Sequence, residues 1–486
     1  MDVIIVLGLL VAVILLYFKS NPLNHSKKFI MRRFINWFPL GMSYAFLYMA
    51  RYNLVVSKNA LGSLLSKEDF GIIFAAGTTV YGFSFLLNGP LVDKIGGKKG
   101  IILACLGACI ANVLMGIVTF LYLHNRLIGN LTFLMSILYA ANMFFQSYGA
   151  VSIIKVKAYW FHVRERGVFG AIFGTLISVG VYFAFDWGQK IVDASKLHIA
   201  GEMTLFQKFI QITFAVDTGT TDAYWLVFFI PAFILVFWAL IDMWLIKDTP
   251  GEANHEDFDT HDASSGEEEG HQTILDLLKR IFTNPIMYTL ASIDLAVGVL
   301  KNGIMQWYAV FAKEVPQVGA EFFFKNWGLL LCIFGIIGGF SSGVLSDRVF
   351  HSRRGPPTAI MNGIMLLASI VLVLTLKTSP IIVGLCCSLI IMSVIGVQSI
   401  IAGTAAVDFG GRRAAATASG IVDGCIYLGG GLQSYCLGYL TTKDWAYWPA
   451  FLVPFAVIGM ILAMRIWKDI PDATKKYLAA KEGKNL

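Results

Sequence analysis

Two cationic residues, Arg51 and Lys301, stand out because each lies inside a long apolar stretch of the sequence. A cation near the middle of a bilayer costs at least about 2.5–3.5 kcal/mol on insertion scales. Arginine offers an oxyanion a planar fork of N–H donors, whereas lysine offers a mobile point charge. Two such cations without counter-charges would suit a doubly negative phosphate group.

A structural explanation competes with this hypothesis, because a buried carboxylate would also neutralise Arg51 or Lys301. The candidates are Asp186, Asp294 and Asp423. Asp294 and Lys301 share a helical face but lie about 10.5 Å apart along the axis, too far for a direct bond. We therefore favour binding over structural pairing. Asp423 lies in the middle of a predicted helix, where it would tune the charge of the site, carry a proton, or bond a neighbouring helix.

Other polar and aromatic side chains on the same predicted helices are expected to line the site. They are Tyr44, Tyr48, Asn53, Tyr81, Gln306, Trp307 and Asp423. Tyrosine and tryptophan also pack helices together, so packing remains an alternative for each of them. The sequence has no HExxH, no G-x-x-x-x-G-K-[ST] and no arguable Ser/His/Asp set. We therefore predict no enzymatic activity, no cofactor and no metal.

The elements that hold these residues are predicted to be membrane helices. Of the 486 residues, 57% are hydrophobic and 14% are charged, whereas soluble domains carry about 25% charge. A helix needs roughly 20 apolar residues to cross a bilayer. We predict twelve such stretches after residue 33, which excludes a soluble enzyme and a nucleic-acid binder: 34–57, 68–92, 100–123, 129–154, 168–192, 223–246, 284–312, 324–346, 357–376, 380–403, 414–440 and 446–467.

The cations predict the orientation. Lys and Arg are in excess in the connections on one side of the predicted bundle, which places both of its ends in the cytoplasm. An additional apolar run from Val3 to Phe18 comes first. No Lys or Arg precedes this run and several follow it, so we interpret it as a retained extra helix rather than a signal peptide.

A hexapeptide recurs in the two halves of the chain, as GPLVDK at residues 89–94 and GVLSDR at residues 343–348. Each copy follows the second predicted helix of a group of six, which indicates an internal repeat. Asp93, Lys94, Asp347 and Arg348 are predicted to form a conformational latch in these loops, with a plain charged turn as the alternative. Parallel repeats of this kind place a substrate site between the halves.

The predicted fold is an all-α polytopic membrane protein of two pseudo-symmetric six-helix bundles plus an extra N-terminal helix. An external loop at residues 193–222 has apolar spacing that predicts a short interfacial helix. The predicted division is a helix and basic loop at 1–33, a bundle at 34–246, an acidic linker at 247–273, a bundle at 274–467 and a basic tail at 468–486.

Several motifs resemble the major facilitator superfamily and, within it, the organophosphate:phosphate antiporters. The hexapeptides are similar to the inner-loop motif of the superfamily. Lys301 departs from many bacterial members, which have arginine there, and residues 150–155 depart from the family pattern of the fourth helix. The motifs closer to the antiporters are Tyr44-x-x-x-Tyr48-x-x-Arg51-x-Asn53, Tyr81-Gly82-Phe83-Ser84, Glu165-Arg166-Gly167, Asp248-Thr249-Pro250, Leu300-Lys301-x-Gly303-Ile304-x-x-Trp307 and Tyr427-Leu428-Gly429-Gly430.

The resemblance implies a monomeric, multi-pass protein of the cell (inner) membrane with a cytoplasmic C-terminus. Its partners would be the lipid bilayer, inorganic phosphate and a phosphorylated small molecule such as hexose 6-phosphate or glycerol 3-phosphate, exchanged by alternating access. Two alternatives stay open. One is proton-coupled uptake of another organic anion, with Asp294 or Asp423 as the proton carrier. The other is a sensor that binds a sugar phosphate without transporting it.

Overall fold

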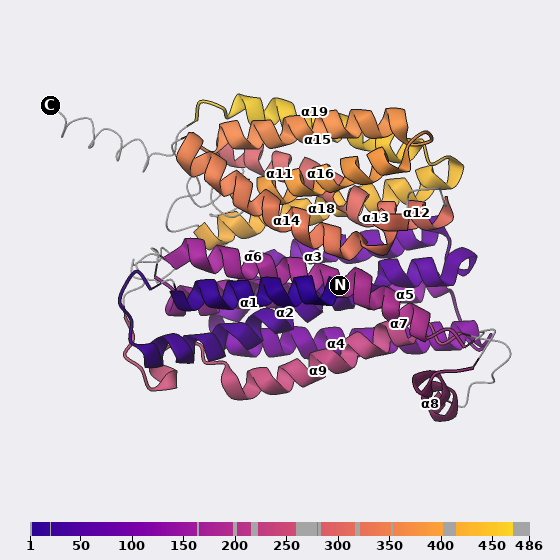
Figure 1. The fold of residues 1–486 in the computed structure, drawn as a ribbon, viewed down its shortest axis with the longest axis horizontal. Helices are drawn as coiled ribbons and strands as arrows, with labels where there is room; N and C mark the ends of the chain where they lie inside the picture. Colours follow the sequence, from indigo (N-terminus) through magenta and orange to yellow (C-terminus); the bar gives the residue numbers. More distant parts are fainter. Residues whose placement is uncertain are drawn as a thin grey trace.

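The computed structural model describes most of the chain, and the described part is built of helices. The described residues are 2–19, 21–162, 165–197, 202–214, 222–258, 279, 283–315, 321–350, 353–401 and 415–469. Long helices lie side by side along the longest axis of the molecule (Figure 1). Within these residues there is no β-strand.

The helices form two bundles. The first bundle consists of α2 (Lys27–Leu61), α3 (Lys67–Ile95), α4 (Gly97–Leu123), α5 (Leu131–Trp160), α6 (Arg166–Tyr182), a π-helical turn (Phe183–Trp187), α7 (Gly188–Ala194) and α9 (Leu226–Leu245). The second consists of α11 (Pro285–Met305), α12 (Trp307–Glu314), α13 (Glu321–Lys325), α14 (Trp327–Val344), a π-helical turn (Leu345–Val349), α15 (Gly355–Thr375), α16 (Pro380–Ile400), α18 (Ala415–Lys443) and α19 (Tyr447–Arg465).

The predicted twelve stretches correspond to helices of these bundles. Among the described residues, seven helices are long and apolar enough to cross a membrane, and the bent helix α3 makes eight. The other predicted stretches coincide with α2 and α18 and with two interrupted helices. One interruption is the π-helical turn between α6 and α7, and the other is Gln306 between α11 and α12. The all-α fold is therefore confirmed, with polar or broken helices where the apolar signal is weaker.

Local signals set several helix starts. Ser26 accepts a hydrogen bond from the Phe29 N–H, so α2 begins before the predicted residue 34. Asn130 caps α5 in the same manner. Asn284 and Ser379 each cap a helix whose first residue is proline, α11 and α16 respectively. Proline suits that position because its missing N–H has no partner there in any helix.

The extra helix α1 (Asp2–Lys19) packs against α6. The Tyr17 hydroxyl donates to the Ile30 carbonyl at 2.8 Å and accepts from Arg33 Nε at 3.0 Å. Arg33 in turn makes a two-pronged bond to Glu165, at 2.8 and 2.9 Å. The extra helix is thus tied to the first bundle by a buried polar cluster at the end of the molecule where α9 leaves for the second bundle.

The opposite end carries α8 (Leu205–Phe214), the short helix predicted in the external loop (Figure 1). Ile210 is buried, whereas Leu205, Phe209 and Ile212 are exposed, as expected for an interfacial helix. We name this the outer end, because the charge distribution predicts that it faces outside.

The two bundles meet along α3 with α18 and along α6 with α14. Polar bonds join them at the outer end. Asp186 accepts from the backbone N–H groups of Gly328 and Leu329, both at 3.1 Å, and Asn59 donates to the Ala309 carbonyl at 3.2 Å. The molecule is therefore held closed at its outer end.

Replacement of Gly298 by alanine should destabilise the second bundle by roughly 1–3 kcal/mol, the usual cost of overpacking. A Cβ atom at Gly298 would collide with the backbone carbonyl of Ile426, so α11 and α18 would have to separate. The measurement is the thermal unfolding midpoint of purified protein in detergent. Gly89→Ala is the matched control, since nothing lies within 4 Å of its added Cβ. Equal midpoints for the two variants would contradict this account of the packing.

Candidate functional site

The Arg51 guanidinium on α2 lies in a cage of aromatic rings between the two bundles. Its carbon Cζ is 4.7 Å from the Tyr48 ring centroid, 4.4 Å from that of Tyr81 and 5.7 Å from that of Tyr427. Nε donates to Gln146 Oε1 at 3.0 Å, and Nη1 donates to the Tyr427 hydroxyl at 3.3 Å. Nη2 has no partner among the described residues. Ring faces stabilise a cation without neutralising it.

A chain of buried amides positions this guanidinium. Gln146 donates to Asn142 Oδ1 at 3.1 Å, and Asn142 donates to the Ala50 carbonyl at 3.0 Å. Asn112 donates to the same Asn142 oxygen at 3.1 Å and accepts from Asn53 at 2.8 Å. Because buried polar groups are costly unless they are bonded, such a network has one favoured arrangement. It joins α2, α4 and α5 behind the arginine.

Lys301 on α11, in the second bundle, lies near the Tyr427 ring that also contacts Arg51. Its Nζ donates to Gln398 Oε1 at 2.9 Å and lies 5.9 Å from the Tyr427 ring centroid. Gln398 Nε2 donates to Asp423 Oδ1 at 2.9 Å. A neutral amide therefore separates the ammonium from the carboxylate. Among the described residues, no carboxylate oxygen lies within 4.0 Å of Arg51 or Lys301, although other ion pairs are present.

Arg51, Lys301, Tyr427 and the side chains bonded to them are called the central site below. Of the predicted lining residues, Tyr48 and Tyr81 contact Arg51, and Tyr44 packs edge-on against Tyr48 with 5.4 Å between ring centroids. Asp423 joins the site through Gln398.

Three other predicted lining residues contact different neighbours. Asn53 donates to Asn112 and to the Val227 carbonyl inside the first bundle. Gln306 bonds Asn302 and Ser434. The Trp307 ring packs 5.6 Å from that of Phe70 and 6.2 Å from that of Trp445. None of the three contacts a cation directly in these bonds: Asn53 belongs to the amide network behind Arg51, Gln306 is bonded inside the second bundle, and Trp307 packs between the bundles.

Sequence reasoning missed three contributors: Gln146, Gln398 and the role of Tyr427. A signal existed for the two glutamines, because each is an uncharged polar residue inside an apolar stretch. A buried amide costs free energy unless it finds a partner, and here the partners are the two cations. Tyr427 was visible only as part of a motif, and its position between two helices from different bundles required the tertiary structure.

Asp294 on α11 is fully buried, and neither of its carboxylate oxygens accepts a hydrogen bond from the described residues. Burial of a carboxyl group without hydrogen-bond partners is expensive, so Asp294 is a costly polar group in the interior of the second bundle. Asp294 is not in direct contact with Lys301, in agreement with their separation along the helix.

The predicted latch residues are only partly described. Asp93 pairs with Lys155 of α5 at 2.9 Å, and its side chain is 66% exposed. Lys94 is exposed. The side chains of Asp347 and Arg348 lie outside the described residues. The N-terminus of α4, which follows the first hexapeptide, is bonded by another acid: Asp248 accepts a hydrogen bond from the Lys98 N–H at 2.7 Å.

Asp248 also explains a glycine in this loop. Gly96 has φ of +90°, and an added Cβ would collide with Asp248 Oδ2. Burial raises the pKa of the Asp248 carboxyl, and the N–H of Lys98 counteracts this shift. The helix N-terminus favours the charged form of the carboxylate.

The chain matches a family model and several known proteins. The model described as Major Facilitator Superfamily matches residues 34–434. The chain is 24% identical over 453 residues to the membrane sensor protein UhpC of Escherichia coli (strain K12), covering 91% of this chain and 94% of that one. It is 23% identical over 437 residues to the glycerol-3-phosphate transporter of Bacillus subtilis (strain 168), covering 88% and 90% respectively.

A probable hexose phosphate transport protein of Chlamydia trachomatis is 23% identical over 487 residues, covering 94% of this chain and 96% of that protein. Among solved structures, a bacterial homolog of the human lysosomal transporter Spinster, in an inward-facing and unoccupied conformation, has a TM-score of 0.66. It is 15% identical and covers 91% of this chain and 98% of its own. At that identity the likeness shows the fold.

The two acids of this loop region should differ in their effect on stability. Asp248→Ala removes the acceptor at the N-terminus of α4 and should cost roughly 1 kcal/mol, the usual value of a helix cap. Asp93→Ala removes an exposed ion pair and should cost roughly 0.5 kcal/mol or less. Thermal unfolding of the purified variants in detergent measures both. A larger loss for Asp93→Ala would mean that its pair with Lys155 is the stronger structural contact.

Proposed function

This chain belongs to the major facilitator superfamily, and we propose that it exchanges a phosphorylated metabolite for inorganic phosphate across the membrane. The observation that carries the proposal is that Arg51 and Lys301, one from each bundle, face the same Tyr427 ring with no carboxylate among the described residues in contact. Relatives named as glycerol-3-phosphate and hexose phosphate transporters support the class of substrate.

The side chains suit a phosphate group with two negative charges. Arg51 keeps Nη2 unbonded among the described residues, so it has a donor for a phosphate oxygen without breaking its bond to Gln146. Lys301 is bonded to a neutral amide, and a phosphate oxygen would replace that amide as a stronger, charged acceptor. The nearby Tyr81 hydroxyl is also without a partner in the described part of the chain and would bond a further oxygen of the substrate.

The same charges give a reason for exchange rather than one-way flux. An empty site has two buried cations with no carboxylate in contact among the described residues, and moving them through a closed intermediate is costly. A bound phosphate or organophosphate removes that cost. In this proposal the bundles at 34–246 and 274–467 rock about the central site, and both directions of movement require a bound anion.

Sugar phosphates are the proposed organic substrates, with hexose 6-phosphate favoured over glycerol 3-phosphate. This preference rests on Lys301. In the organophosphate:phosphate antiporters that this chain resembles, lysine occurs at this position in members that carry glucose 6-phosphate. The aromatic surfaces of Tyr44, Tyr48 and Tyr81 would pack against a sugar ring, as aromatic side chains do in apolar pockets with few polar groups.

Two other functions each have one supporting observation. Proton-coupled uptake is favoured by Asp294, whose buried carboxyl lacks a hydrogen-bond partner among the described residues. A sensor without flux is favoured by the relative named as a membrane sensor protein. Transport measurements separate both from phosphate exchange.

Proteoliposomes loaded with inorganic phosphate should take up radiolabelled glucose 6-phosphate, whereas phosphate-free vesicles should not. The reason is that the empty site reorients poorly. Glycerol 3-phosphate, phosphoglycerate and phosphoenolpyruvate are compared as competitors. Equal uptake by phosphate-free vesicles under a pH gradient, lost in Asp294→Asn, would replace exchange by proton coupling. Binding of glucose 6-phosphate with no uptake under any loading would establish a sensor.

Arg51→Gln should lower the exchange rate at least about 30-fold, because a charged hydrogen bond to a buried phosphate is worth roughly 2 kcal/mol or more. Arg51→Lys should recover only part of it, since the planar fork is lost. Lys301→Gln should behave like Arg51→Gln, and Lys301→Arg should keep most activity. Lys325→Gln is the charge-matched control, because Lys325 pairs with Glu321 on an exposed helix. Full exchange by Arg51→Gln would contradict the proposed site.

A further inference from the structure

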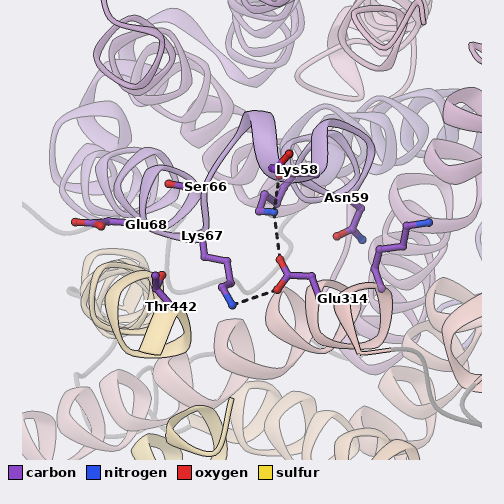
Figure 2. A pocket seen from close by; sticks show the side chains of 10 residues that line it. Lys58, Asn59, Ser66, Lys67, Glu68, Glu314 and Thr442 are labelled. Atoms are coloured by element: carbon purple, nitrogen blue, oxygen red, sulfur yellow. Dashed lines mark hydrogen bonds and ion pairs between the residues drawn. The ribbon is translucent and has the colours of Figure 1, made fainter. Parts of the chain in front are cut away.

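A second cluster of cations lines a pocket at the outer end, separate from the central site. The pocket has a volume of about 440 Å³ and lies between α2, α3, α12 and the end of α18, with Lys58, Lys67, Lys313, Glu68, Glu314 and Asn59 among its lining residues (Figure 2). Lys58 lies about two helical turns beyond Arg51 on α2. The lining includes three lysines and two glutamates, so it carries an excess of positive charge, and only Glu314 of the two acids pairs with these lysines in the structure.

One carboxylate holds two of these lysines. Glu314 Oε1 lies 3.4 Å from Lys58 Nζ, and Oε2 lies 3.1 Å from Lys67 Nζ (Figure 2). The Lys67 ammonium also lies 4.5 Å from the centroid of the Trp445 ring. Both lysines belong to the first bundle, whereas Glu314 and Trp445 belong to the second. These contacts therefore tie the two bundles together at the pocket.

The geometry of Glu314 resembles that of a bound oxyanion. Two ammonium groups converge on opposite oxygens of one carboxylate, and a phosphate group presents oxygens of the same charge and similar spacing. The Lys58 side chain is only 4% exposed, while that of Glu314 is 34% exposed. The Lys67 side chain is 16% exposed, so the acid is the most accessible of the three partners to water and solutes.

We propose that this pocket is an anion-binding vestibule, in which a phosphate-bearing anion displaces Glu314 from Lys58 and Lys67 and so releases the outer end to open. The anion takes the place of the Glu314 carboxylate, so Lys58 and Lys67 keep a negatively charged partner throughout. Glu314 leaves with the second bundle and becomes solvated. The identity of the anion rests on the proposed function, but binding of inorganic phosphate to the vestibule does not.

The test follows the opening of the outer end in purified protein. Asn59→Cys places a thiol in the pocket lining, where Asn59 bonds the second bundle. The rate of labelling by a water-soluble maleimide is measured, and the parent protein, with its own seven cysteines, supplies the background. Inorganic phosphate should accelerate labelling, and sodium chloride at the same ionic strength should not.

Variants of the lining residues test whether the acceleration of labelling by phosphate arises at the vestibule. Glu314→Gln should raise the labelling rate without phosphate by about fivefold, as expected for the loss of weak, partly exposed ion pairs, and should lower the phosphate concentration that gives half of the effect. Lys58→Gln with Lys67→Gln should label rapidly and no longer respond to phosphate. Lys67→Arg should keep the response, which shows that the site is folded. Lys325→Gln is the control with the same loss of charge and should match the parent.

One further variant distinguishes phosphate binding at the vestibule from phosphate binding at the central site. With Arg51→Gln and Lys301→Gln present, phosphate should still accelerate labelling at Asn59→Cys, because the vestibule is intact. Loss of the response there, or its persistence in Lys58→Gln with Lys67→Gln, would overturn the vestibule. Failure of phosphate exchange in proteoliposomes with the labelling response intact would overturn the proposed function and leave the vestibule standing.

Discussion

The structure depends on two buried cations that have no carboxylate in contact among the described residues. Arg51 is surrounded by aromatic rings and bonded to one amide, and Lys301 is bonded to another amide. Ring faces and amides orient a cation without cancelling its charge. In the proposed function, a bound anion offsets part of the cost of burying these charges, so that the charge of the substrate matters for its binding.

The two bundles supply the cations in equivalent ways. Arg51 lies on the first long helix of the first bundle, and Lys301 lies on the first helix of the second. Each is backed by its own amide, Gln146 and Gln398 respectively. The groups behind these amides differ, because a chain of asparagines supports Gln146, whereas Asp423 supports Gln398. The lysine therefore has a carboxyl group one amide away, whereas further amides lie behind the arginine.

In the proposed mechanism, movement begins at the contacts between the bundles. Bonds of Asp186, Asn59 and Glu314 join the bundles at the outer end. Of these, only the Glu314 contacts are between opposite charges, so only they respond directly to an added anion. The extra helix α1 is attached to the first bundle through the Arg33–Glu165 pair and its packing on α6, and it would travel with that bundle.

The sequence alone determined the membrane class, the helix content, the internal repeat and the two cations, because apolar length and buried charge are visible residue by residue. The start of α2 required the Ser26 cap to be recognised, and the short helix α8 was predicted from its apolar spacing. The rest of the site was decided by the tertiary structure. A helical period tells which residues share a face but not which helix that face meets. For that reason Tyr427 between the two cations, Gln398 between Lys301 and Asp423, and Glu314 between two distant lysines emerged only when the bundles were packed together.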